Sequence, residues 1–269
     1  MPPAHDPAVA LLRQRLAVVL FRPKFAENVG SVARACLNMG CERILLVAPR
    51  DYAPERARPL ATAHAEPLLD QARLFPDLPS ALAPFTQVYG TTARLGGRRA
   101  TLLSPVQAAL QIVGQILEGH DVALLFGPED RGLTNIEIDL CTHLISVPTA
   151  MANVSLNLAQ AVLLILYECL QAARGAPSPI PKPLQADFVD HAEQEALFAA
   201  LRHLLTAIDF LPKTNSDHGM LKLRRFWHRL ELRRDEYAML MGVCRQMLRA
   251  LDGERRMEME GKLKASGEL

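Results

Sequence analysis

The chain has 269 residues, of which 49% are hydrophobic and 22% are charged, and its formal net charge is +1 at pH 7. This composition is typical of a globular protein with one sizeable core, or one core and a small appendage. A net charge near zero excludes a uniformly basic protein, so any surface for a polyanion must come from local clustering of cations.

Five scattered cysteines without a CxxC pair disfavour a disulfide framework and a zinc site, so we expect no metal. They fit a reducing cytoplasm, where we expect the protein to reside. Residues 1–10 lack the basic and apolar segments of a signal peptide. The longest apolar run, 161–167, is too short to span a bilayer, so we expect no membrane partner.

Apolar runs of strand length recur in the first 150 residues, separated by helical segments. They are 16–21, 43–48, 87–91, 122–126 and 144–148. Such runs are typical of buried parallel strands, because helices cover both faces of a parallel sheet. The sequence therefore predicts an α/β fold.

A helix is predicted directly after the first strand. Apolar residues repeat at helical spacing over 28–39, Asn28 stands where a helix N-cap would, and Gly40 suits the left-handed residue that ends a helix. Gly30 would allow another backbone to approach closely.

The second half of the chain changes character after a long helix. Residues 155–171 are apolar nearly all round, which predicts a helix buried against the sheet or a partner subunit. Residues 174–183 hold alternating prolines and predict a stiff extended connector. Helices follow at 188–208, 220–232 and 234–251. We therefore expect a domain at 1–173, a linker at 174–187, a helical module at 188–252 and a charged tail at 253–269.

The helical module concentrates cations around Trp227, the only tryptophan. The candidates for phosphate contact are Lys222, Arg224, Arg225, Arg229 and Arg233. The module would either grip RNA or support a dimer. The plainer interpretation of the same stretch is an amphipathic helix with a solvated basic face.

Three loops, each following a predicted strand, carry polar residues that a structural connection would not need. Because open α/β sheets bind ligands at the carboxyl ends of their strands, these loops should converge. The first loop leads to Arg34, whose neighbours Ala33 and Ala35 are small. A guanidinium in an apolar stripe needs a partner, and it is suited to clamping a phosphate.

The second and third loops differ from known nucleotide-binding motifs. In 125–137, Gly127 and Gly132 bracket charged residues, whereas Thr134 and Glu137 form a structural capping box. The lysine and spacing of a Walker loop are missing, which disfavours phosphoryl transfer. In the third loop, Asn153, Ser155 and Asn157 could each cap the next helix, and this surplus suggests a site.

Taken together, ENVGSVARACLNMG, LLFGPEDRGLTNIEIDLC and ISVPTAMANVSLNLAQAV resemble the three ordered motifs of the SPOUT methyltransferase superfamily, in its TrmH-type 2′-O-ribose branch. The resemblance covers about the first 170 residues. The proline-containing linker followed by FLPK and KLRRFWHRLELRRDE is similar to the TrmJ subgroup, which methylates a pyrimidine riboside in the tRNA anticodon loop.

The resemblance implies an α/β knot, in which the chain after the fifth predicted strand threads through a loop to form a trefoil. It also implies a homodimer, RNA as partner and S-adenosylmethionine as cofactor. The implied catalytic residues are Asn28, Arg34, Glu129, Ser155 and Asn157. The implied cofactor-binding residues are Thr91, Thr92, Ala93, Gly127, Val147, Val154, Ser155 and Leu156.

Methyl transfer from a sulfonium is an in-line displacement, so the protein must hold the ribose 2′-oxygen against the methyl carbon and help remove its proton. Family models give Arg34 the role of base, but a guanidinium with a pKa above about 12 is poorly suited to it. We hypothesise that Arg34 binds the adjacent RNA phosphate. Glu129 would brace the loops, because a free carboxylate would repel phosphate.

Three other functions compete with this interpretation. A 2′-O-methyltransferase of ribosomal RNA, or of another tRNA position, would share everything up to the linker. A non-catalytic RNA-binding protein on the same fold would not need Asn28, Arg34 and Ser155. An ordinary dinucleotide-binding enzyme is disfavoured, because no glycine-rich turn follows the first strand.

Overall fold

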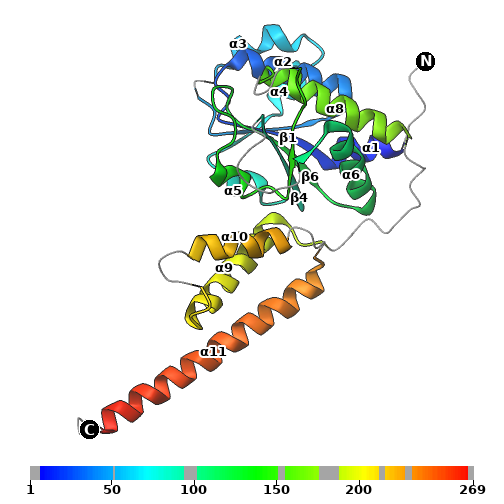
Figure 1. Cartoon of the computed structure of the whole chain (residues 1–269). Coiled ribbons are helices and arrows are strands. Elements are labelled where there is room, and N and C mark those ends of the chain that lie inside the picture. Colours follow the sequence, from blue (N-terminus) through cyan, green and yellow to red (C-terminus); the bar gives the residue numbers. More distant parts are fainter. Residues whose placement is uncertain are drawn as a thin grey trace. The chain divides into compact units, whose positions relative to one another are not determined.

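The computed structural model describes residues 7–50, 52–93, 102–150, 155–175, 188–211, 216–227 and 232–265. The chain divides into two compact units, Met1–Ala186 and Asp187–Leu269. Unit 1 has an α/β fold, and the described part of unit 2 is built from helices (Figure 1). The predicted fold class, an α/β domain followed by a helical extension, is confirmed.

Unit 1 contains a seven-stranded sheet in which every pairing is parallel. The strands are β1 (Leu16–Phe21), β2 (Arg43–Val47), β3 (Arg73–Phe75), β4 (Gln87–Thr91), β5 (Leu102–Leu103), β6 (Val122–Phe126) and β7 (His143–Ile145). Their order across the sheet is β3-β2-β1-β6-β4-β7-β5. The short strands β3 and β5 were not predicted, because two or three residues carry no periodicity.

Helices cover the sheet unequally (Figure 1). One core cluster joins the sheet to α1 (Pro7–Arg15), α2 (Ala26–Met39), α3 (Pro54–Ala61), α4 (Glu66–Asp70), α6 (Pro105–Glu118) and α8 (Leu158–Gly175). The second cluster lies on the other face and includes α5 (Leu78–Leu82) and the end of α7 (Asn135–Ile138). The capping box that Thr134 and Glu137 predict for α7 is present.

The N-cap of helix α2 lies three residues before the predicted one. Phe25 occupies the N-cap, and its carbonyl accepts hydrogen bonds from the N–H groups of Asn28 and Val29 at 3.1 and 3.4 Å. The prediction of Asn28 as N-cap is therefore wrong, because that side chain is used elsewhere. The prediction for Gly40 is confirmed, since it ends the helix with a φ of 77°.

The close approach predicted at Gly30 is confirmed. A Cβ built on this residue would lie 2.0 Å from the carbonyl oxygen of Ala57 in α3. Only glycine lets the two helices come this near, so Gly30 sets the position of α3 on α2.

Unit 2 contains α9 (His191–Ala207), α10 (Ser216–Trp227) and α11 (Arg234–Ala265). A small core formed by Phe198, Leu211 and Met220 joins the first two helices. Helix α11 continues past residue 252, where the sequence predicted a charged tail, because its charged residues are good helix formers. None of the helices in the described part of the chain combines the length and hydropathy needed to cross a bilayer.

Two predicted features fall largely outside the described residues. Helix α8 includes Arg174 and Gly175, the first two residues of the predicted linker, and the rest of the linker up to residue 187 lies outside. The trefoil knot concerns the path of the chain after β7, of which residues 151–154 lie outside. The knot stays a prediction.

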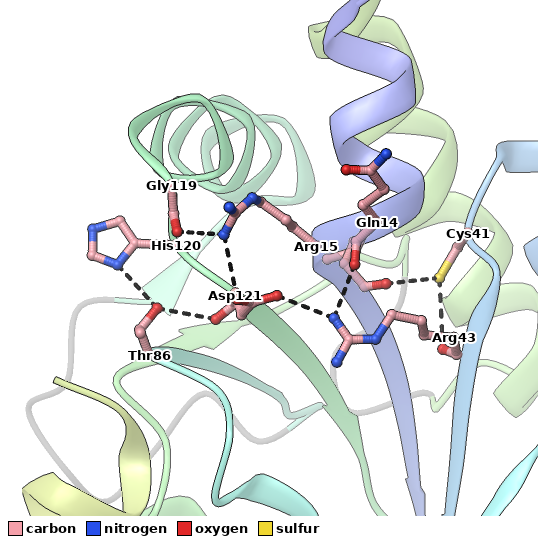
Figure 2. A network of polar contacts seen from close by, with 9 residues as sticks. Gln14, Arg15, Cys41, Arg43, Thr86, Gly119, His120 and Asp121 are labelled. Carbon is pink, nitrogen blue, oxygen red and sulfur yellow. Dashed lines mark hydrogen bonds and ion pairs between the residues drawn. The ribbon is translucent and has the colours of Figure 1, made fainter. Parts of the chain in front are cut away.

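A carboxylate ties together the amino end of the sheet (Figure 2). Asp121, just before β6, accepts hydrogen bonds from Arg15 at 3.3 Å and from Arg43 at 3.1 Å. Arg15 also donates to the carbonyl of Gly119, and Arg43 donates to that of Gln14. One side chain therefore joins the end of α1, the start of β2 and the turn before β6.

Replacing this carboxylate should lower stability. Asp121→Ala leaves two partly buried guanidinium groups without their anion, and we expect unfolding free energy to fall by about 1–2 kcal/mol. Glu42→Ala is the control, because it removes only the ion pair with Arg13. In this pair the Arg13 side chain is 53% exposed and the Glu42 side chain is 52% exposed. It should change stability by less than about 0.5 kcal/mol. Urea unfolding of both variants measures the difference, and equal losses would contradict the role of Asp121.

Candidate active site

A cavity of about 480 Å³ lies at the carboxyl ends of β4, β6 and β7. This is the edge of a parallel sheet where α/β folds bind ligands, and the volume is in the range for small molecules. The cofactor positions implied by the resemblance share this cavity wherever they are described. They are Thr91, Thr92, Ala93, Gly127, Val147, Ser155 and Leu156. Val154 lies outside the described residues.

The cavity also has an apolar wall that the sequence analysis missed. Its members are Phe126, Leu133, Ile145, Leu158, Ala161 and Ile165. Phe126 and Ile145 are the last residues of β6 and β7. The predicted strand ends could have indicated this wall, because a residue at the carboxyl end of a central strand faces the ligand crevice.

Gly127 lets the loop after β6 fold back on itself. A Cβ built on this residue would lie 2.5 Å from both the carbonyl carbon of Gly132 and the nitrogen of Leu133. Real Cβ atoms do not approach backbone so closely, so the loop closes over this side of the cavity only with glycine present.

The carboxylate of Glu129 joins two of the three loops directly. One oxygen, Oε2, accepts the N–H of Lys24 at 2.8 Å, and the other, Oε1, accepts the side-chain N–H of Asn28 at 2.9 Å. Lys24 and Asn28 belong to the loop and helix that follow β1, whereas Glu129 follows β6. Both oxygens are therefore engaged in holding the loops in place.

The third loop is joined through Asn157. Its side-chain N–H donates to Oδ1 of Asn28 at 3.0 Å, and its own Oδ1 accepts the N–H of Ala159 at 2.9 Å at the start of α8. One residue thus begins the helix and fixes Asn28. The chain Glu129–Asn28–Asn157 brings four of the implied catalytic residues to one place, since exposed Ser155 lies beside Asn157.

A second cavity, of about 510 Å³, adjoins the first and shares Glu129, Ser155, Leu156 and Leu158 with it. Its other lining residues are Phe25, Glu27, Asn28, Arg56 and Asn157.

An ion pair forms part of the wall of this second cavity. Arg56 donates to Glu27 Oε1 from Nε and Nη2, at 3.1 and 2.8 Å. A backbone hydrogen bond and then the one from Arg56 hold the pKa of the Glu27 carboxyl below its ordinary value. Both side chains are therefore ionised at physiological pH, and their charges cancel.

Arg34 is not brought to these cavities. It lies six residues after Asn28 on α2, which places it about 120° away around the helix. Its side chain is exposed, and among the described residues it has no hydrogen-bond or ion-pair partner. The arginine on which the sequence analysis relied most therefore faces away from the site of its own chain.

Of the cations predicted to contact RNA in unit 2, Arg224 is already engaged by an anion. Arg224 forms a bidentate ion pair with Glu195 on α9, and its guanidinium lies 4.5 Å from the centre of the Phe198 ring. Lys222 is exposed on α10, and Arg233 stacks on the Phe188 ring at 5.4 Å. The side chain of Arg225 and all of Arg229 lie outside the described residues.

No three His, Cys, Asp or Glu side chains in the described ranges gather in a way that could hold a metal ion. The site is instead built from amides, a hydroxyl, a braced carboxylate and apolar walls. Such a set can bind an uncharged ring and position a hydroxyl group.

Two family models match the chain. Residues 15–167 match the SpoU rRNA Methylase family, and residues 192–256 match the C-terminal domain of the tRNA methyltransferase TrmJ. Together with the fold and the cavity, the first match defines a SpoU-type methylase, an enzyme.

Individual relatives identify a narrower family among the SpoU-type methylases. A tRNA (cytidine/uridine/adenosine-2′-O-)-methyltransferase TrmJ of Pseudomonas aeruginosa is 32% identical over 247 residues, which cover 89% of this chain and 96% of that protein. A tRNA (cytidine/uridine-2′-O-)-methyltransferase TrmJ of Cronobacter sakazakii is 31% identical over 90% of this chain and 98% of its own length. The crystal structure of TrmJ from Z. mobilis ZM4 is 34% identical, with a TM-score of 0.71 over 86% of this chain and 98% of that one. The chain belongs to the TrmJ family.

Adding one methyl group at Gly127 should weaken ligand binding at the first cavity. Gly127→Ala forces the loop 127–133 to move, so we expect affinity for S-adenosylhomocysteine to fall at least about tenfold. Gly114→Ala on α6 is the matched control, since its Cβ would meet nothing within 4 Å. It should leave affinity unchanged and raise stability by about 0.5–1 kcal/mol. Calorimetric titration of both variants tests this, and tight binding by Gly127→Ala would refute the closed-loop geometry.

Proposed function

We propose that this protein uses S-adenosylmethionine to methylate the ribose 2′-hydroxyl of a pyrimidine nucleotide in the anticodon loop of a tRNA. The observation that carries the proposal is the chain Glu129–Asn28–Asn157, which gathers three loops beside a cavity suited to the cofactor. The names of the relatives, which are tRNA 2′-O-methyltransferases, supply the substrate. The five cysteines are free thiols, which supports a cytoplasmic location.

The first cavity fits S-adenosylmethionine. The apolar side chains of Phe126, Leu133 and Ile145 suit the faces of adenine, and residues 91–93, which line the same cavity, would contact its edge. The fold-back at Gly127 brings the backbone of Gly132 and Leu133 to the wall of the same cavity. When bound, this cofactor supplies a methyl group on a sulfonium, which needs no metal for transfer.

The acceptor hydroxyl would enter from the second cavity. Ser155 lines both cavities, so its hydroxyl is placed to position the ribose at their junction. Asn28 is fixed by Glu129 on one side and Asn157 on the other, which keeps its amide in one orientation. Glu129 acts as the brace, because both of its oxygens already accept hydrogen bonds.

A homodimer would complete the site. Arg34 is exposed and faces away from the cavities of its own chain, so its guanidinium would bind the RNA phosphate at the site of a second copy. Helix α8, which packs on α2, exposes the large apolar side chains Leu163 and Tyr167. A second copy covering these helices would bury that apolar surface and bring its own Arg34 toward this site.

Mixing two inactive variants tests the shared site. Arg34→Ala and Ser155→Ala should each lose most methyl transfer, because each removes a group from every site. If Arg34 acts across the dimer, half of the sites in mixed dimers are intact, and co-expression of the two differently tagged variants should restore about a quarter of the parent activity. Each variant co-expressed with itself is the control. Mixed dimers without activity would show that Arg34 acts within its own chain.

Methyl transfer itself is tested with labelled S-adenosylmethionine, bulk tRNA and, in a parallel reaction, ribosomal RNA. We expect label in tRNA, at a ribose 2′-oxygen when the modified nucleotide is mapped. Label only in ribosomal RNA, or at another tRNA position, would favour a different 2′-O-methyltransferase with the same catalytic domain. No transfer to any RNA would leave a non-catalytic RNA-binding protein.

A further inference from the structure

Phe25 is an unusual residue for the helix N-cap position that it occupies. It is the N-cap of α2, with φ −115° and ψ 120°, and it makes no side-chain capping bond. Ser, Thr, Asp or Asn would satisfy a free helix N–H there, whereas phenylalanine cannot. Nor does the core need the ring, since 45% of the residue is exposed. A residue that serves neither the helix nor the core is a candidate for binding.

The loop that carries Phe25 is held firmly at several points. The N–H of Arg22 donates to the carbonyl of Val47 at 2.8 Å, and the N–H of Lys24 donates to Glu129 at 2.8 Å. Arg22 adopts a φ of 49°, in the left-handed region that a side chain occupies only under strain. The backbone that carries Phe25 is therefore held in place before any ligand arrives, which lowers the entropic cost of binding.

The ring lines the second cavity together with groups that suit a nucleotide. The Glu27–Arg56 ion pair lines the same cavity and both side chains are partly exposed, so the pair can contact polar groups of a ligand. Lys24 is exposed, and its ammonium lies 5.5 Å from the centre of the Phe25 ring. The cavity thus combines an aromatic face, a partly exposed ion pair and a nearby cation.

We propose that Phe25 is the stacking platform for the base of the nucleotide whose ribose is methylated, and that the second cavity is the pocket for this nucleotide. The inference rests on the proposed function. The two cavities meet at Ser155, so a base on Phe25 would leave its ribose directed toward the first cavity. Aromatic stacking accepts any base, so Phe25 contributes affinity and orientation, and base preference must come from polar groups such as Glu27.

Substitutions at Phe25 test its contribution to RNA binding separately from its contribution to the stability of the protein. Phe25→Leu keeps an apolar residue that does not cap the helix, so we expect unchanged stability and a rise of roughly tenfold in KM for RNA. Phe25→Ser introduces a capping hydroxyl and should raise Tm by about 2 °C while still weakening RNA binding. Phe25→Trp should retain RNA affinity. Leu74→Ala, which truncates an apolar residue on β3 that is 62% exposed, is the control and should match the parent.

The decisive experiment removes the Phe25 ring and the target base, first separately and then together. Parent and Phe25→Leu are compared on a stem–loop RNA with its natural target nucleotide, and on the same RNA with an abasic riboside at that position. Stacking predicts that the parent loses about tenfold in affinity on the abasic RNA, whereas the variant loses little more. If the variant's tenfold penalty persists on the abasic RNA, Phe25 does not contact the target base and the inference fails.

Two further measurements distinguish failure of the inference about Phe25 from failure of the proposed function. Affinity for S-adenosylhomocysteine should be the same in parent and Phe25→Leu, since Phe25 does not line the first cavity. A matching loss of cofactor affinity would mean that the substitution disturbs the whole site, and would overturn the assignment. If the parent methylates no RNA, the proposed function fails. If the parent is active and Phe25→Leu equals it on natural RNA, only the inference about Phe25 fails.

Discussion

Glu129 connects parts of the chain that are far apart in sequence, and the remaining contacts of the site are arranged around it. Its carboxylate accepts one hydrogen bond from the Lys24 backbone and one from Asn28, and Asn28 in turn accepts one from Asn157. A carboxylate beside an RNA phosphate would ordinarily oppose binding. Here two N–H donors occupy both oxygens and restrict their direction, which is the arrangement expected of a brace between loops.

The central strand β6 has a carboxylate at each end, and the two have different consequences. Asp121, before the strand, engages Arg15 and Arg43, whose charges fix the amino edge of the sheet. Glu129, after the strand, engages uncharged donors beside the cavities. The ion pairs of Asp121 add rigidity at the edge of the sheet opposite to the cavities, whereas Glu129 accepts only backbone and amide N–H groups among the described residues.

The sequence predicted the central strands and the lining of the first cavity well, because long apolar runs and motif order are local signals. It missed β3 and β5, which are too short to show a period. It misplaced the N-cap, because an asparagine near a helix start is usually a cap, and nothing local indicated that Asn28 binds Glu129. The ion pair of Arg224 with Glu195 was also hidden, since it depends on how α10 packs on α9.

Helix α2 explains why the arginine was the hardest residue to interpret. Gly30 faces α3 at a distance only glycine allows, Asn28 faces Glu129, and Arg34 faces solvent. These directions follow from helical spacing once the start of the helix is known, and the start depended on a phenylalanine that does not look like a cap. This single helix contacts a neighbouring helix on one side, the site on a second and solvent on a third, so Arg34 lies away from the cavities of its own chain, as the proposed shared site requires.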